Sequence, residues 1–200
     1  SGAGDFNGDG FDDLMVTASI DITNQGYYQD YLLILSGKDG TQLYDFYNVY
    51  IGNNAGDVDA DGVEDIIAKD VYSSDVSVYS GKTRRYLYSL SDPSSRTEYG
   101  TSIDGAGDVN GDGFDDLVVG AGIDDINDPI SGIAYIYSGK DGSLITSVSG
   151  ISPDNYLGSV VRGAGDVNGD GLDDVIIATP YSDNRAQDSG VVRVISIGAE

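Results

Sequence analysis

The chain has 200 residues, and its 34 acidic side chains against 10 basic ones give a formal net charge of −24 at pH 7. This excess of negative charge argues against binding to nucleic acid or to an anionic membrane surface, because both attract basic proteins. The absence of cysteine and histidine excludes disulfide bonds and the ligands that zinc, copper and iron prefer. A hydrophobic fraction of 40% suits a folded core, but no run approaches the roughly 20 apolar residues of a membrane-inserted span.

The first element along the chain is a nine-residue loop rich in aspartate and glycine, and it recurs three more times. The loops begin at Asp5, Asp57, Asp108 and Asp166. Their intervals of roughly 50 to 60 residues are typical of propeller blades and related arrays. Half of the acidic residues fall inside these loops, where they repel one another unless a cation neutralises them.

Each loop is followed by short runs of valine, isoleucine, leucine and tyrosine, which favour strands. The first runs cover 14–16, 66–68, 117–119 and 175–178, and the second cover 31–35, 76–79, 133–137 and 191–195. Ser-Gly-Lys at 36–38, 80–82 and 138–140 then predicts a turn into a third strand at 41–47, 86–90 and 143–148. A leading strand is predicted before loops 3 and 4 only, at 99–103 and 157–161, and nothing is predicted after the third strand of the fourth copy.

This pattern predicts an all-β fold, because short strands alternate with glycine turns and helical periodicity is absent. We expect a β-propeller of four-stranded antiparallel blades, with repeats at 1–47, 48–90, 91–148 and 149–200. We expect unpaired sheet edges at the two ends, which would invite a partner strand and self-assembly. Three arrangements stay open: a compact four-bladed propeller, part of a propeller of about six to eight blades, or a protomer completed by its neighbour.

The oxygen spacing within each loop suits Ca²⁺, which takes six to eight hard oxygen ligands. Positions 1, 3, 5 and 9 offer side-chain oxygens, position 7 offers its backbone carbonyl, and glycine at position 6 permits the sharp turn. The predicted metal ligands are Asp5, Asn7, Asp9, Phe11 and Asp13; Asp57, Asp59, Asp61, Val63 and Asp65; Asp108, Asn110, Asp112, Phe114 and Asp116; and Asp166, Asn168, Asp170, Leu172 and Asp174. We therefore expect about four Ca²⁺ ions, with Mg²⁺ the weaker candidate because it demands strict octahedral geometry.

Two further loop positions separate this site from its alternatives. An EF-hand needs a bidentate glutamate at position 12, but the residues there are Val16, Ala68, Val119 and Ile177. The acidic residue at position 8 is expected to face solvent or to cap its loop rather than to bind the ion. That residue is Asp12, Glu64, Asp115 or Asp173.

The sequence resembles the FG-GAP repeats of integrin-α-type β-propellers. In that family an aromatic residue and glycine precede a calcium loop, and a Gly-Ala-Pro-like segment follows it. The corresponding pairs here are Tyr99-Gly100 and Leu157-Gly158, and the trailing segments are 120–122 and 178–180. The second copy departs from the pattern, since Asp59 and Ala60 replace Asn-Gly.

The resemblance implies a structural, adhesion or assembly module with protein or glycan partners at a cell surface or in the matrix. Calcium sites of extracellular modules bind at about 10⁻⁴–10⁻³ M, so such loops are filled where calcium is plentiful, outside the cell. A carbohydrate- or ligand-binding propeller is the first alternative, with Tyr27, Tyr28, Tyr72, Tyr156 and Tyr181 in or near loops. A polysaccharide-active enzyme is the second, but we expect no enzyme and no catalytic residues, because the clustered acids are already assigned to calcium.

Overall fold

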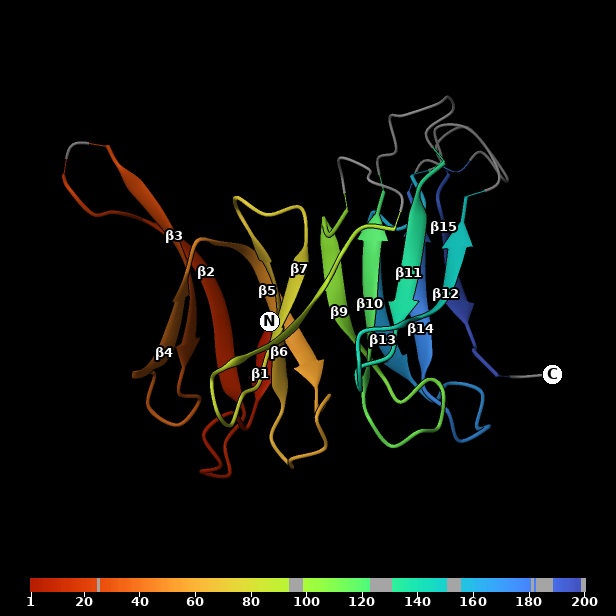
Figure 1. The fold of residues 1–200 in the computed structure, drawn as a ribbon, viewed down its shortest axis with the longest axis horizontal. Helices are drawn as coiled ribbons and strands as arrows, with labels where there is room; N and C mark the ends of the chain where they lie inside the picture. Colours follow the sequence, from red (N-terminus) through yellow and green to blue (C-terminus); the bar gives the residue numbers. More distant parts are fainter. Residues whose placement is uncertain are drawn as a thin grey trace.

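The computed structural model describes residues 1–24, 26–93, 99–122, 131–150, 156–180, 182 and 189–198, and these residues form an all-β array (Figure 1). No helix long and apolar enough to cross a bilayer occurs in these ranges. Blade 1 contains β1 (Gly2–Gly4), β2 (Asp13–Asp21), β3 (Tyr28–Leu35) and β4 (Gln42–Tyr47), and blade 2 contains β5 (Val49–Gly56), β6 (Asp65–Asp70), β7 (Val76–Tyr79) and β8 (Tyr86–Leu90). Blade 3 contains β9 (Ser102–Gly107), β10 (Asp116–Ala121), β11 (Ile133–Tyr137) and β12 (Leu144–Ser149), and blade 4 contains β13 (Val160–Gly165), β14 (Asp174–Thr179) and β15 (Val191–Ile195).

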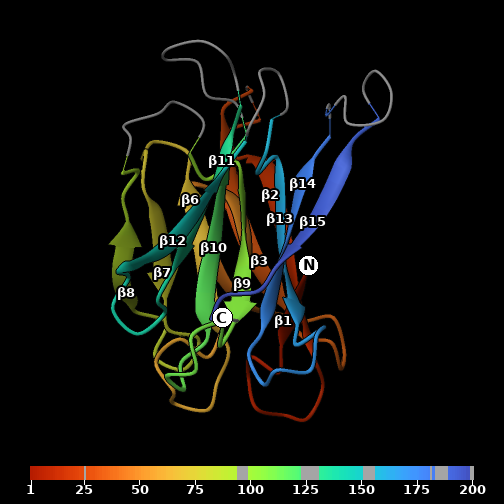
Figure 2. The same ribbon diagram turned by 90° about the vertical axis from the view of Figure 1, so that its right-hand side faces the viewer.

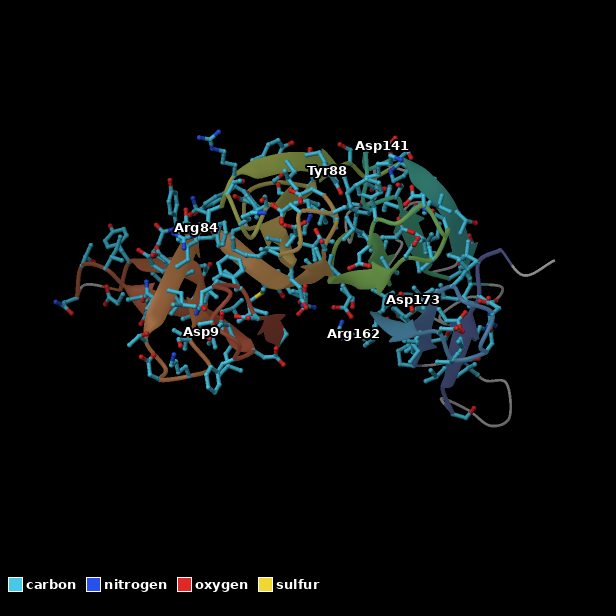
Figure 3. The ribbon with its side chains drawn as sticks, turned by 90° about the horizontal axis from the view of Figure 1, so that it is seen from below. Asp9, Arg84, Tyr88, Asp141, Arg162 and Asp173 are labelled. Atoms are coloured by element: carbon cyan, nitrogen blue, oxygen red, sulfur yellow. The ribbon has the colours of Figure 1, made fainter. Side chains whose placement is uncertain are left out.

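The four blades follow one another around an arc, with blades 1 and 4 at its two ends (Figure 3). Every strand pairs antiparallel with its neighbour within a blade. The leading strands β5, β9 and β13 lie side by side at the inner edge of the array. This radial packing of small antiparallel sheets is the β-propeller architecture that the sequence predicts.

Each pair of neighbouring blades encloses its own hydrophobic cluster. Met15, Leu32 and Ile34 of blade 1 meet Ile66 and Ala68 of blade 2. The next two junctions repeat this arrangement with the following clusters. Alternate residues of each central strand therefore face opposite neighbours, which explains why these strands are apolar on both faces.

The leading strands differ from the sequence prediction. In blades 3 and 4 they extend through the Gly-Ala-Gly segment that precedes the loop, so β9 and β13 end at Gly107 and Gly165 rather than at residues 103 and 161. Blade 1 also has a short leading strand, β1, where none is expected, and β5 is a further strand that the sequence did not predict. The pairing register shifts at this segment in every blade, and its last glycine has a positive φ of 62–75°. A bulge of this kind needs glycine, which lowers strand propensity and hides the strand from pattern analysis.

Candidate metal centres

The four acidic loops lie at the same end of the array, along the lower edge of Figure 1. Each loop connects the leading strand of a blade to the next strand, so its aspartates are held between two paired strands. The sequence repeat thus becomes a row of four acidic loops on one rim of the propeller.

Backbone hydrogen bonds to the first aspartate curl each loop in the same way. In loop 2, the Asp57 carboxylate accepts from the N–H groups of Asp61 and Gly62, both at 2.9 Å. Asp61 at position 5 accepts in turn from the Val63 N–H at 3.0 Å. The corresponding bonds form at Asp5 and Asp9, at Asp108 and Asp112, and at Asp166 and Asp170.

The carboxylates at positions 1, 3 and 5 come closest together in loop 2. One oxygen from each of Asp57, Asp59 and Asp61 lies within 4.8 Å of the others, a separation that one Ca²⁺ can bridge. Among the described residues no other group of three carboxylates meets this spacing, because asparagine stands at position 3 in loops 1, 3 and 4. Asp65, the position 9 aspartate of loop 2, does not belong to this group of three carboxylates.

The aspartate at position 9 is buried in every loop and joins the loop to its own blade. Asp65 accepts from the Gly81 N–H at 2.8 Å and from the Val58 N–H at 2.9 Å. Asp13 accepts from the Gly37 N–H at 3.0 Å. Asp116 accepts both kinds of bond, from the Gly139 and Val109 N–H groups at 3.1 Å, and Asp174 accepts the bond from inside its own loop, from the Val167 N–H at 3.0 Å. The middle residue of Ser-Gly-Lys is therefore a donor to the candidate site as well as part of a turn.

Unpaired oxygens inside the loops provide a test of whether a cation fits. Asp13 Oδ2, Asp59 Oδ1 and Asp174 Oδ1 are buried and have no hydrogen-bond partner. In loop 3 the equivalent space is filled by the Asn110 amide, whose nitrogen donates to both Asp116 oxygens at 3.2 and 3.0 Å. A buried carboxylate oxygen without a partner is costly, and a divalent cation would supply what is missing. The donor set is all oxygen, so the residues present fit Ca²⁺.

Burial also changes the ionisation of the position 9 aspartates. It raises the pKa of Asp65 to about 7, with the nearby Asp59 charge adding to the shift and the Gly81 N–H opposing it. Burial likewise raises the pKa of Asp116 to about 7, against the Gly139 and Val109 N–H groups. The pKa of Asp59 is raised by burial and by the charges of Asp61 and Asp57.

These shifts predict a pH dependence whose direction depends on calcium. A carboxyl group with a folded-state pKa raised from 3.8 to about 7 stabilises the fold below pH 3.8 and loses this contribution as pH rises through 7. In calcium-free buffer we expect the free energy of unfolding, measured by urea denaturation, to fall between pH 5 and pH 8. Calcium requires the ionised carboxylate, so its own stabilisation should grow over the same interval.

The control for this prediction is the double variant Asp65→Asn and Asp116→Asn, which removes both titrating groups but keeps an amide oxygen as acceptor. It should flatten the calcium-free pH profile. An unchanged slope in the variant would show that other groups cause the dependence.

The acids at position 8 make contacts that the sequence did not predict. Asp115 accepts from the Asp57 N–H of the preceding loop at 2.7 Å, and Asp173 accepts from the Asp108 N–H at 3.0 Å. Their own N–H groups donate back to the carbonyls of Asp57 and Asp108, at 3.3 and 3.1 Å. In blades 3 and 4 the position 8 acid therefore caps the loop of the preceding blade, whereas Glu64 accepts from the Asn54 side chain of its own blade and Asp12 is exposed. Figure 3 shows Asp173 at this inner edge.

The repeated lysine also contacts the candidate site. Lys82 Nζ donates to the Asp61 carbonyl at 2.8 Å and lies 3.9 Å from its carboxylate. Lys38 lies 3.9 Å from the Asp9 carboxylate in the same position. Because these side chains are about half exposed, each pair contributes little to stability, but it offsets part of the loop's negative charge.

The fold and the loops together define a β-propeller whose blades each carry an acidic loop on one rim. The family model for the FG-GAP repeat matches residues 1–30, 99–137 and 158–195, and the chain belongs to this family. Residues 48–90, which include the variant loop with Asp59 and Ala60, lie outside the matched ranges. The glycine of the pair that precedes each loop contacts the segment that follows the loop. The Gly100 N–H donates to the Gly120 carbonyl at 3.0 Å, and the Gly158 N–H donates to the Ala178 carbonyl at 3.1 Å.

Several integrin alpha chains are similar to this sequence. Integrin alpha-5 of Xenopus laevis is 27% identical over 184 residues, which cover 84% of this chain and 17% of the integrin chain. Integrin alpha-2 of Mus musculus is 30% identical over 145 residues, covering 60% of this chain and 12% of the integrin. The chain therefore spans less than a fifth of the length of these relatives.

One solved structure has a similar fold at low sequence identity. An acylaminoacyl peptidase of Pyrococcus horikoshii matches with a TM-score of 0.56 and 11% identity, over 94% of this chain and 30% of that one. The β-propeller domain of the trilobed protease from Pyrococcus furiosus matches with a TM-score of 0.49 and 10% identity, over 94% and 52%. At this identity the likeness concerns the fold alone.

Proposed function

We propose that the chain is a calcium-stabilised β-propeller module that acts outside the cell in adhesion or assembly. The observation that carries this proposal is the set of buried, unpaired carboxylate oxygens in equivalent loops. The ligands would be the twenty residues predicted from the sequence, five in each loop, for about four Ca²⁺ ions. Bound calcium would supply positive charge that offsets the repulsion among the loop aspartates.

The position of the loops suggests how bound calcium would stabilise the packing of neighbouring blades. Each candidate site is joined to its own blade through position 9, and loops 2 and 3 are joined to the next blade through Asp115 and Asp173. A loop that is ordered by a cation would therefore hold two neighbouring sheets in place. We propose the repeats 1–47, 48–90, 91–148 and 149–200 as the units that are locked in this way.

Membership of the FG-GAP family and the similarity to integrin alpha chains support a role in adhesion at a cell surface or in the matrix. The same relatives favour a binding module over an enzyme. Calcium sites of extracellular modules bind at about 10⁻⁴–10⁻³ M, and we propose an affinity of this class here, which would be sufficient where calcium is abundant.

Calcium-dependent attachment tests this role. Cells should adhere to a surface coated with the chain in buffer with about 2 mM calcium, a concentration at which sites of this class fill, and should detach in EGTA. The variant Asp57→Asn with Asp61→Asn should adhere less, whereas Asp141→Asn, on an exposed turn, should adhere as the wild type does. Attachment that is the same in calcium and in EGTA would rule out a calcium-dependent adhesive module.

A glycan-binding propeller is the second candidate, and one feature favours it. A cavity of about 390 Å³ lined by Thr17, Ala18, Ser19, Asp30, Val49 and Tyr50 lies between blades 1 and 2. It combines hydroxyl and carboxylate groups with one exposed ring, as sugar sites do. Of the five tyrosines considered from the sequence, Tyr27, Tyr28 and Tyr72 are strongly exposed, Tyr156 is half-buried, and Tyr181 lies outside the described residues. Loss of glycan-array binding in Tyr50→Ser, but not in Tyr72→Ser, would support this candidate.

A further inference from the structure

Loops 2 and 3 can be compared directly, because blades 2 and 3 each pack against another blade on both sides. Both loops lie at the lower end of Figure 2, together with those of the other blades. Their sequences differ at position 3, where loop 2 has Asp59 and loop 3 has Asn110. Loop 2 therefore has four carboxylates among its proposed ligands, whereas loop 3, like loops 1 and 4, has three.

The side chains at position 3 make different contacts in the two loops. Asp59 Oδ1 is buried and has no hydrogen-bond partner, and Asp59 belongs with Asp57 and Asp61 to the group of carboxylates within 4.8 Å of one another. The Asn110 nitrogen donates instead to both oxygens of Asp116, at 3.2 and 3.0 Å. In loop 3 this amide must turn away from the position 9 carboxylate before an ion can bind, whereas in loop 2 the oxygens are already assembled.

The clustered aspartates of loop 2 are also better shielded from solvent. Asp57, Asp59 and Asp61 are all half-buried, whereas positions 3 and 5 of loop 3 are exposed. Opposite charges attract more strongly where water is partly excluded, so the same ion gains more in loop 2. Lys82 offsets part of the charge at Asp61, but its side chain is about half exposed and solvent screens it.

Position 4 of loop 2 has a strained backbone. Ala60 has a φ of 55°, in the left-handed region that disfavours a side chain, where the other three loops have glycine at 73–79°. Alanine has fewer accessible conformations than glycine, so it restricts the loop before an ion arrives. A strained residue of this kind persists only where the surrounding structure holds it, and such residues are common at binding sites.

We infer that loop 2 is the tightest calcium site of the array and fills before loops 1, 3 and 4, and that Asp59 determines this order. The inference rests on the calcium role proposed above and deepens it. Ligand charge and site rigidity tune calcium affinity in proteins, and both favour loop 2. We expect loop 2 to bind about tenfold more tightly than loop 3, at about 10⁻⁴ M compared with about 10⁻³ M. The repeat outside the ranges that match the family model would then have the strongest site.

A calcium titration followed by NMR through the backbone amides of Gly62 and Gly113 measures both affinities in one sample. Each amide donates to the first aspartate of its own loop, so its signal reports on that loop. The calcium concentration at half saturation should be about tenfold lower for Gly62 than for Gly113. Asp59→Asn should raise the value at Gly62 about tenfold, and the reciprocal change Asn110→Asp should lower the value at Gly113 by about the same factor.

Two further variants are controls. Asp141→Asn removes one negative charge from an exposed turn, and it should change neither half-saturation concentration by more than about twofold. Ala60→Gly keeps all four carboxylates of loop 2 and relieves the positive φ. It should therefore change the affinity of loop 2 much less than Asp59→Asn does.

Equal half-saturation concentrations at Gly62 and Gly113 would overturn the inference and leave the proposed calcium role intact. The assignment to Asp59 would be wrong if the order persisted in Asp59→Asn, or if Ala60→Gly abolished it as completely. Should Asp59→Asn fail to fold, an unchanged affinity of loop 3 in Asn110→Asp would overturn it as well. If no loop glycine responded to calcium, the calcium role itself would be rejected and the inference with it, so the two failures are distinguishable.

Discussion

Thermal unfolding of the chain in excess EGTA is expected to begin far below its unfolding in calcium. Sites with dissociation constants of about 10⁻⁴–10⁻³ M in about 2 mM calcium stabilise the fold by roughly 0.7 to 1.8 kcal/mol each. Four sites that are lost together on unfolding give about 3 to 7 kcal/mol. For a chain of this size each kcal/mol changes the melting temperature by about 2–4 °C, so the expected decrease is roughly 6 to 28 °C.

The physical reason for this large effect is the arrangement of charge. The loops concentrate half of the acidic residues, and several of their carboxylate oxygens are buried without partners. Circular dichroism melts with calcium, with EGTA and with EGTA plus excess magnesium measure the effect and its selectivity. Magnesium should restore little of the melting temperature, because it demands strict octahedral geometry. Identical melts in calcium and EGTA would contradict the proposed role of the loops.

Replacement of Asp116 by alanine is expected to cost about 3–5 kcal/mol of unfolding free energy in calcium. The side chain is fully buried, and its loss leaves the N–H groups of Gly139 and Val109 without acceptors while it removes a proposed ligand. Urea denaturation gives the free energy. The matched control is Asp141→Ala on an exposed turn, where the loss should be below about 1 kcal/mol.

The variant Asp116→Asn separates the two causes. Its amide oxygen can accept from only one of the Gly139 and Val109 N–H groups and it carries no charge, so in EGTA it should be more stable than the alanine variant. In calcium it should lose the contribution of one site. If Asn and Ala at this position were equally damaging in EGTA, the hydrogen-bond part of this explanation would be wrong.

Most of the fold follows from local sequence patterns. The apolar runs after each loop became β2, β6, β10 and β14, and the runs that follow became β3, β7, β11 and β15. These strands have β-branched residues on both faces, which the sequence shows directly. The leading strands were displaced or missed because they end in Gly-Ala-Gly, or in Asn-Ala-Gly in β5. β5 also contains Asn53, whose burial depends on a bond to the Ile103 carbonyl of the next blade at 2.7 Å. Local propensity contains no information about such a partner.

The candidate site was likewise predictable from the sequence only in its local features. The acidic residues and their spacing within a loop are local, so the sequence is sufficient to propose them as ligands. The contacts of Asp115 and Asp173 with the preceding loop join residues about sixty positions apart in the chain. The donation from Gly139 to Asp116 depends on two strands packing at one end. Two repeated features could have indicated these contacts: the acid at position 8 and the glycine of Ser-Gly-Lys. A solvent-exposed charge explained the first equally well, and a turn explained the second.

A calcium titration followed by ¹⁵N-resolved NMR tests the central claim most directly. The amides of Gly10, Gly62, Gly113 and Gly171 donate to the first aspartate of their loops, so their signals report on each site separately. We predict that all four signals shift and saturate as calcium rises through about 10⁻⁴–10⁻³ M. Four glycine amides that stay unchanged up to about 10 mM calcium, well above that range, would contradict the account.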